Sequence, residues 1–182
     1  MVRACRLATA LLAFAAAARG EDPVGPTLPW GLHLAYGSDP ATSMTVGWST
    51  RDPVAGSVVR YGVAAAPGGA AELDQAAAGN ASTFQPPGSA RPQDLHLVRL
   101  TGLLPGTTYA YAVGSDAAGS DSSALFDFTT APEATQATEW APTLAIFGDM
   151  GISANAQDTL VWLLKDLEDG AIDFVAHIGD HG

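Results

Sequence analysis

The chain has 182 residues, enough for one domain of ordinary size and a remainder. Hydrophobic residues make up 47% of it and charged residues 15%, so it can bury a core and is not globally disordered. The formal net charge of −11 argues against nucleic acid and anionic membranes as partners, because both require a basic patch.

Residues 1–20 have the organisation of a secretory signal peptide. Arg3 and Arg6 come first, followed by the apolar run LATALLAFAAAA and a small-residue exit. The run is shorter than a bilayer span of roughly 20 residues, although an uncleaved membrane anchor is the alternative. Cleavage would remove three arginines and no acidic residue, taking the net charge from −11 to −14. We therefore predict a protein of the secretory pathway, extracellular or vacuolar/lysosomal, that does not bind membranes.

Two features bear on how the mature chain is modified. The single cysteine, Cys5, lies in the predicted signal peptide, so the mature chain forms neither a disulfide nor a thiolate metal site. Asn80-Ala81-Ser82 is an N-glycosylation sequon in a stretch rich in Gly, Ala and Ser, which we expect to be exposed. We predict a glycan at Asn80, with chance occurrence of the tripeptide as the alternative.

The next region has the sequence pattern of an all-β domain. Residues 21–30 are Pro-rich and predict an entry linker. In the segment DLHLVRL, Leu95 and Leu97 face one way and His96 and Val98 the other, a period of two. Strands separated by turn residues over about 100 positions predict an antiparallel β-sandwich across 31–130. The expected strands are 31–36, 43–50, 57–62, 94–100, 107–114 and 123–130. A low-complexity connection at 64–80 separates the first three from the last three.

One turn sharpens the fold prediction. The segment from Leu103 to Tyr109, LLPGTTY, resembles the L-x-P-G-T-x-Y turn of fibronectin type III domains. In that turn the tyrosine hydroxyl bonds back to the backbone of the turn, forming a tyrosine corner. We expect Tyr109 to make this bond and Trp48, in the second strand, to lie at the centre of the core.

After a Pro/Ala/Thr-rich linker at 131–142, the pattern changes to that of a βαβ unit in 143–182. The apolar run at 143–148 is typical of a strand buried on both faces, and 172–179 is a second such run. Between them a helix capped by Ser153 or Asn155 would end near Gly170. Its apolar stripe is Leu160, Leu163, Leu164 and Leu167. Two strands and one helix do not make a domain, so we expect an incomplete α/β domain.

Both predicted strands end in Gly-Asp: FGDMG at 147–151 and IGDHG at 178–182. Open α/β sheets build their sites at the carboxyl ends of their strands, and neighbouring strands lie about 4.8 Å apart. If the strands are neighbours, Asp149 and Asp180 converge, and two such carboxylates repel unless one is protonated or a cation lies between them. A pair of divalent metals fits this arrangement. The alternative is that each aspartate caps a turn or helix.

The order of these motifs resembles that of the purple acid phosphatases, in the calcineurin-like metallophosphoesterase superfamily. The similarity covers nearly all of the mature chain. Matching segments in the sandwich are LHLAYGSDPATSMTVGWST, VVRYG, LHLVRLTGLLPGTTYAYAVGS and FDFTTAP. TLAIFGDMG resembles the family's G-D-x-G metal motif, and FVAHIGD the start of its G-D-x-x-Y motif.

The resemblance implies a metal-dependent acid phosphatase that hydrolyses phosphate monoesters. By it, Asp149 would hold the iron-site metal and Asp180 would bridge two metals, iron with zinc, manganese or iron. The motif tyrosine would stand one residue beyond Gly182, and the later G-N-H-[DE] and G-H-x-H motifs are absent. These 182 residues therefore lack most of the metal ligands, and we assign no catalytic residue among them. We expect them to be inactive alone and to be the product of a truncated gene model.

The four histidines do not supply the missing ligands. His33 and His96 fall in predicted strands of the sandwich, where a structural role is expected. His177 precedes the second Gly-Asp and is expected in the core or behind the ligands, and His181 occupies a variable position of the motif.

Two other functions stay open at this point. One is a non-catalytic recognition or adhesion module, with 31–130 as its working part and a vestigial tail. The other is a different α/β enzyme that uses an aspartate as phosphoacceptor. No G-x-G-x-x-G or G-x-x-x-x-G-K-[ST] motif supports a nucleotide-binding fold.

Overall fold

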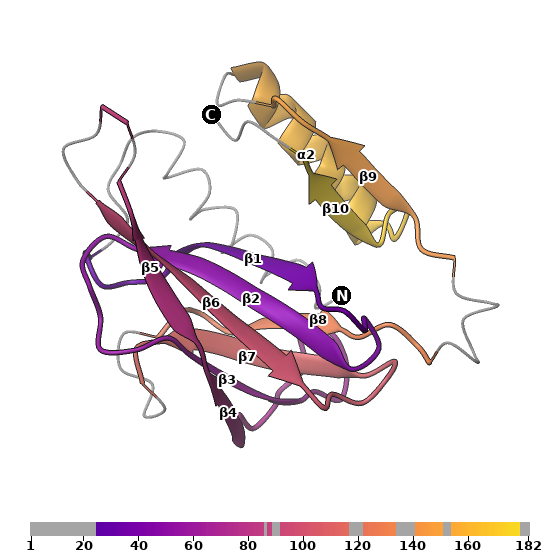
Figure 1. Ribbon diagram of the computed structural model, residues 1–182. Coiled ribbons are helices and arrows are strands. Elements are labelled where there is room, and N and C mark those ends of the chain that lie inside the picture. Colours follow the sequence, from indigo (N-terminus) through magenta and orange to yellow (C-terminus); the bar gives the residue numbers. More distant parts are fainter. Residues whose placement is uncertain are drawn as a thin grey trace. The chain divides into compact units, whose positions relative to one another are not determined.

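The computed structural model describes residues 25–85, 87–88, 92–116, 122–133, 141–150 and 154–178. The predicted signal peptide and Asp180 lie outside these residues. The chain divides between Ala134 and Thr135 into two compact units, each with its own sheet or sheets (Figure 1). Among the described residues, no helix combines the length and apolar character that spanning a bilayer requires.

The first unit consists of two four-stranded sheets in which every pairing is antiparallel. This arrangement confirms the predicted β-sandwich, because two sheets with one apolar face each bury those faces against one another. The first sheet has the order β1 (Trp30–Tyr36), β2 (Ser43–Thr50), β6 (Gln93–Thr101), β5 (Asn80–Phe84). The second has the order β4 (Gln75–Ala78), β3 (Val58–Val63), β7 (Thr108–Gly114), β8 (Phe126–Thr129).

The low-complexity connection expected at 64–80 contains strand β4 and the first residue of strand β5. Alanine and glutamine have weak β-propensity, so the local pattern hid strands that form through pairing with β3 and β6. The chain passes from one sheet to the other across a single residue, Gly79. A Cβ at this position would collide with the carbonyl oxygen of Leu97, which explains the glycine.

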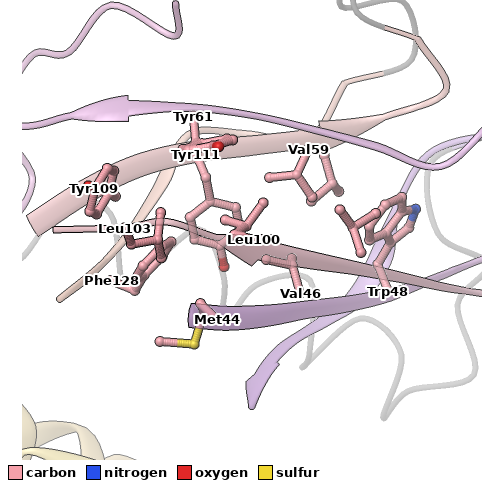
Figure 2. Packing of buried hydrophobic residues seen from close by; sticks show 12 residues of the cluster. Met44, Val46, Trp48, Val59, Tyr61, Leu100, Leu103, Tyr109, Tyr111 and Phe128 are labelled. Carbon is pink, nitrogen blue, oxygen red and sulfur yellow. The ribbon is translucent and has the colours of Figure 1, made fainter. Parts of the chain in front are cut away.

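The core lies between the two sheets and follows the predicted alternation. Along β6, Asp94, His96, Val98 and Leu100 are buried and the residues between them are not. Trp48 is only 1% exposed, as expected of a central core residue. Figure 2 shows Val46 and Trp48 of β2 pointing into the same space as Val59 of β3. An aromatic group formed by Tyr61, Tyr109, Tyr111, Phe126 and Phe128 continues the core along the second sheet.

The turn before β7 is the predicted tyrosine corner. The backbone N–H of Leu104 donates a hydrogen bond to the Tyr109 hydroxyl oxygen at 2.9 Å. The Thr130 hydroxyl donates to the Leu104 carbonyl at 2.7 Å, and the Gly106 N–H donates to the Ala131 carbonyl at 2.9 Å. These bonds satisfy polar groups in a part-buried turn and tie it to the end of the sandwich.

His96 forms a buried polar link between the sheets that the sequence did not predict in detail. Its Nε2 lies 3.0 Å from the Thr50 hydroxyl in β2, and its Nδ1 lies 2.8 Å from the Ser57 hydroxyl beside β3. The ring stacks on Trp48 with centroids 4.9 Å apart. Burial lowers the pKa of His96 below its ordinary value, and the neighbouring Asp94 carboxylate opposes that shift. The role is structural, as predicted.

We expect the sandwich to lose stability on acidification because of His96. The unfolded chain binds a proton at His96 near pH 6.5, whereas the folded chain binds it only at lower pH. The stabilising contribution is therefore present above about pH 6.5 and is lost as the pH falls through the pKa of the folded state. Urea unfolding at about pH 7.5 and about pH 5 measures this loss. His96→Gln should reduce the pH dependence, and His33→Gln, at an exposed histidine, should leave it unchanged. Equal dependence in wild type and His96→Gln would contradict the assignment.

The second unit is the predicted βαβ unit: β9 (Leu144–Phe147), α2 (Ala154–Glu168) and β10 (Phe174–His177), with the two strands parallel. The leucine stripe of α2 is partly buried, whereas Val161 and Trp162 are 60% and 64% exposed. Helix α2 is followed by Gly170 in the left-handed region (φ 71°), as predicted for its end. Of the two expected capping residues, Ser153 lies outside the described residues, and Asn155 is the second residue of α2 and so does not precede the helix.

One expectation for this unit was wrong. The strands at 143–148 and 172–179 were both expected to be buried on both faces. Leu144 and Ile146 are instead 40% and 61% exposed in the first, and Val175 is 37% exposed in the second. The unit has only two strands and one helix, and a single helix covers one face of a sheet. The apolar run has the composition of a strand that is covered on both faces, but among the described residues of this unit only helix α2 is available to cover a face.

Candidate metal centre

The candidate site lies at the carboxyl ends of β9 and β10. The strands pair in parallel from Leu144 with Phe174 to Phe147 with His177. The Ile178 N–H donates to the Phe147 carbonyl at 2.9 Å, which continues the pairing past the last strand residues. This register confirms that the strands are neighbours, the condition on which convergence of the two Gly-Asp motifs depended.

The amino end of the pair is also fixed. The Asp173 N–H donates to the Thr143 carbonyl at 2.9 Å, and the Thr143 N–H donates to the Asp173 carboxylate at 2.8 Å. Near the other end, the rings of Phe147 and His177 pack edge to face with centroids 4.9 Å apart. Contacts at both ends oppose a slip of register between the two strands.

Asp149 has a backbone conformation that its side chain does not favour. Its φ is 54°, and it is the one non-glycine residue with positive φ in the described part of the chain. A left-handed conformation costs an L-residue roughly 1–2 kcal/mol, less for aspartate, whose side chain can bond locally. Such conformations cluster at functional sites, where the surrounding structure maintains them. No sequence pattern indicates this conformation, which distinguishes Asp149 within a motif that was selected only by its spacing.

The described residues bring only part of the candidate site into view. Asp149 is exposed at the end of β9. Asp180 and His181 lie outside the described residues, so their convergence with Asp149 stays a prediction. His177 lies in β10 against Phe147, and its supporting role also stays a prediction. Within the described residues no group of three or more His, Cys, Asp or Glu is placed to hold a metal ion.

The other predicted site residue, Asn80, belongs to the first unit. It is exposed at the start of the edge strand β5 and pairs with Leu97 of β6. The structure therefore places the sequon on the surface of the sandwich.

A carboxylate at this position fits a hard or borderline metal cation, because such ions take oxygen ligands. Its exposure leaves the oxygens open to an ion, and the sharp turn at Asp149 ends the strand where a site is expected. One carboxylate is far from a complete coordination shell, so further ligands must join it.

Comparison with known proteins identifies the family. The profile described as "Purple acid Phosphatase, N-terminal domain" matches residues 29–130. Acid phosphatase type 7 of Mus musculus is 35% identical over 171 residues, which cover 93% of this chain and 36% of the relative. The Danio rerio protein of the same name is 36% identical over 161 residues, covering 88% and 33%.

A solved structure extends the similarity to the fold. A purple acid phosphatase from yellow lupin (Lupinus luteus) seeds superposes with a TM-score of 0.66 and 26% identity, covering 86% of this chain and 30% of that one. The chain thus spans about a third of the length of the curated relatives it matches. By its sequence and its fold, it belongs to the purple acid phosphatase family, and residues 29–130 are that family's N-terminal domain.

Proposed function

We propose that this protein is a secreted, metal-dependent acid phosphatase that hydrolyses phosphate monoesters. The family membership supports a phosphatase. The observation that carries the metal-dependent part is the strained Asp149 just past the carboxyl end of β9, which pairs in parallel with β10. A recognition module would gain nothing from a strained aspartate at this position.

In this proposal Asp149 and Asp180 would hold a pair of metal ions, iron with zinc, manganese or iron. When bound, the metal pair supplies Lewis acidity to the phosphate ester. The contribution of this chain is to fix where the carboxylates stand. The parallel pairing of β9 and β10 brings the carboxyl ends of the two strands side by side. The left-handed backbone of Asp149 turns the chain just past the end of β9, where its carboxylate is exposed. Two carboxylates do not complete a dinuclear site, so further ligands would have to join them.

Hydrolysis of p-nitrophenyl phosphate by the full-length protein, recovered from the medium of secreting cells, tests the proposal. We expect hydrolysis at acidic pH that a chelator abolishes and that added iron with zinc or manganese restores. Residues 1–182 alone should show none, because two carboxylates do not complete a dinuclear site. Hydrolysis that survives exhaustive chelation would contradict metal dependence. A secreted full-length protein without hydrolysis would favour the recognition module.

A further inference from the structure

The outer face of the first sheet carries an apolar strip beside the sequon. The strip consists of Leu95, Leu97 and Phe84, which are 38%, 57% and 45% exposed. Strand β6 buries alternate residues, so Leu95 and Leu97 face away from the core. The register pairs Asn80 with Leu97 and Ser82 with Leu95, which places the sequon residues on the same outer face.

Asn80 is held next to this strip. It follows Gly79, whose N–H donates to the Ser57 carbonyl at 2.9 Å and whose Cα packs against the backbone of Leu97. Directly opposed residues of an antiparallel pair have Cβ atoms about 4.5–5.5 Å apart, so a group attached to Asn80 starts beside Leu97. On the far side of Leu97 stands Gly47, where the ring of His33 occupies the position that a side chain would take.

Strand β5 is also an edge strand. It pairs with β6 on one side, and within the described residues no strand pairs with its other side. All five of its residues are exposed. An exposed edge next to an apolar strip is a surface on which two chains can associate, and proteins protect such edges with bulky or polar groups.

We propose that Asn80 carries an N-linked oligosaccharide that lies over the apolar strip and shields the β5 edge. The first sugar rings pack their C–H faces against Leu97 and Leu95, while their hydroxyls stay in water. The inference rests on the passage through the secretory pathway that the proposed function includes. It explains why the modification site lies at Asn80, and the phosphatase reaction itself does not require this modification.

The modification needs a lipid-pyrophosphate-linked oligosaccharide as donor. The side-chain nitrogen of Asn80 attacks the anomeric carbon of the donor sugar. A C–N bond forms, the anomeric C–O bond breaks, the amide loses one proton, and the lipid pyrophosphate leaves. The hydroxyl of Ser82 completes the sequon that the transferase requires.

Occupancy is tested on the full-length protein secreted from eukaryotic cells. We expect peptide mapping to find the glycan at Asn80, and Ser82→Ala, which destroys the sequon, to remove it. Ser82→Thr is the matched control, because it keeps the sequon and should keep the glycan. Secreted protein with an unmodified Asn80 would overturn the proposal while leaving the secreted phosphatase intact. Protein that never enters the secretory pathway would overturn both.

Shielding is tested by removing the glycan enzymatically from folded protein, which avoids effects on folding. We expect binding of an apolar dye to rise by about twofold or more, and self-association to appear in sedimentation, because the strip becomes exposed. Leu97→Thr should suppress both changes in deglycosylated protein, since threonine suits an exposed strand position but removes the apolar contact. Dye binding and sedimentation that do not change on deglycosylation would overturn the shielding role even with Asn80 occupied.

Discussion

Trp48→Ala is expected to lower the free energy of unfolding of the sandwich by about 3–5 kcal/mol, the usual range for a buried large aromatic residue. Trp48 is 1% exposed, and its ring stacks on His96. Its loss leaves a cavity between the sheets. It also removes the indole ring that stacks on the imidazole of His96, whose nitrogens contact the hydroxyls of Thr50 and Ser57. Urea unfolding followed by circular dichroism measures the change.

Trp162→Ala is the matched control for that prediction. Trp162 is 64% exposed on α2, so its removal should change unfolding by less than about 0.5 kcal/mol. If Trp48→Ala does not fold, Leu100→Ala provides a milder probe, since Leu100 is fully buried and the expected cost is about 2–5 kcal/mol. Equal effects of Trp48→Ala and Trp162→Ala would contradict the placement of Trp48 at the centre of the core.

Asp149→Asn in the full-length enzyme is expected to reduce phosphatase activity by more than about 100-fold. Loss of a residue behind a metal ligand already costs about 10–100-fold, and loss of a ligand should cost more. Asparagine has the same shape as aspartate and also tolerates the left-handed conformation that Asp149 adopts with φ 54°. The substitution therefore removes the charge and leaves the backbone turn in place.

Asp158→Asn is the matched control, because Asp158 is an exposed aspartate on the helix of the same unit. It should leave activity unchanged. Thermal unfolding of the Asp149→Asn apoprotein should match that of the wild-type apoprotein, which separates loss of a ligand from loss of fold. Wild-type activity in Asp149→Asn, or an equal loss in Asp158→Asn, would contradict the assignment of Asp149.

The sequence predicted best where the signal was local and strong. The alternation around Val98, the corner before Tyr109 and the leucine stripe of α2 each follow from a short periodic pattern or a specific turn. The segment at 64–80 was not recognised as containing strands because its alanines and glutamine have little β-propensity, and pairing across the sheets decides its conformation. Such pairing joins residues far apart in the chain, which local patterns do not report.

The candidate site was predictable in position but not in conformation. Matching Gly-Asp turns indicated the carboxyl edge of a parallel pair, and the register of β9 and β10 confirms that the strands are neighbours. The left-handed backbone of Asp149 follows from the turn that the surrounding chain imposes and has no sequence signal. The hydroxyls of Thr50 in β2 and Ser57 just before β3 meet His96 from segments far apart in the chain, and no local pattern predicts these contacts.

Metal content of the purified full-length protein tests the central claim most directly. We expect about two metal ions per chain, one of them iron, in the wild type. In Asp149→Asn with Asp180→Asn, the content should fall to less than one ion per chain while the sandwich stays folded. Wild-type metal content in that double variant would show that these aspartates are not ligands and that the family's metal site, in this protein, is built from other residues.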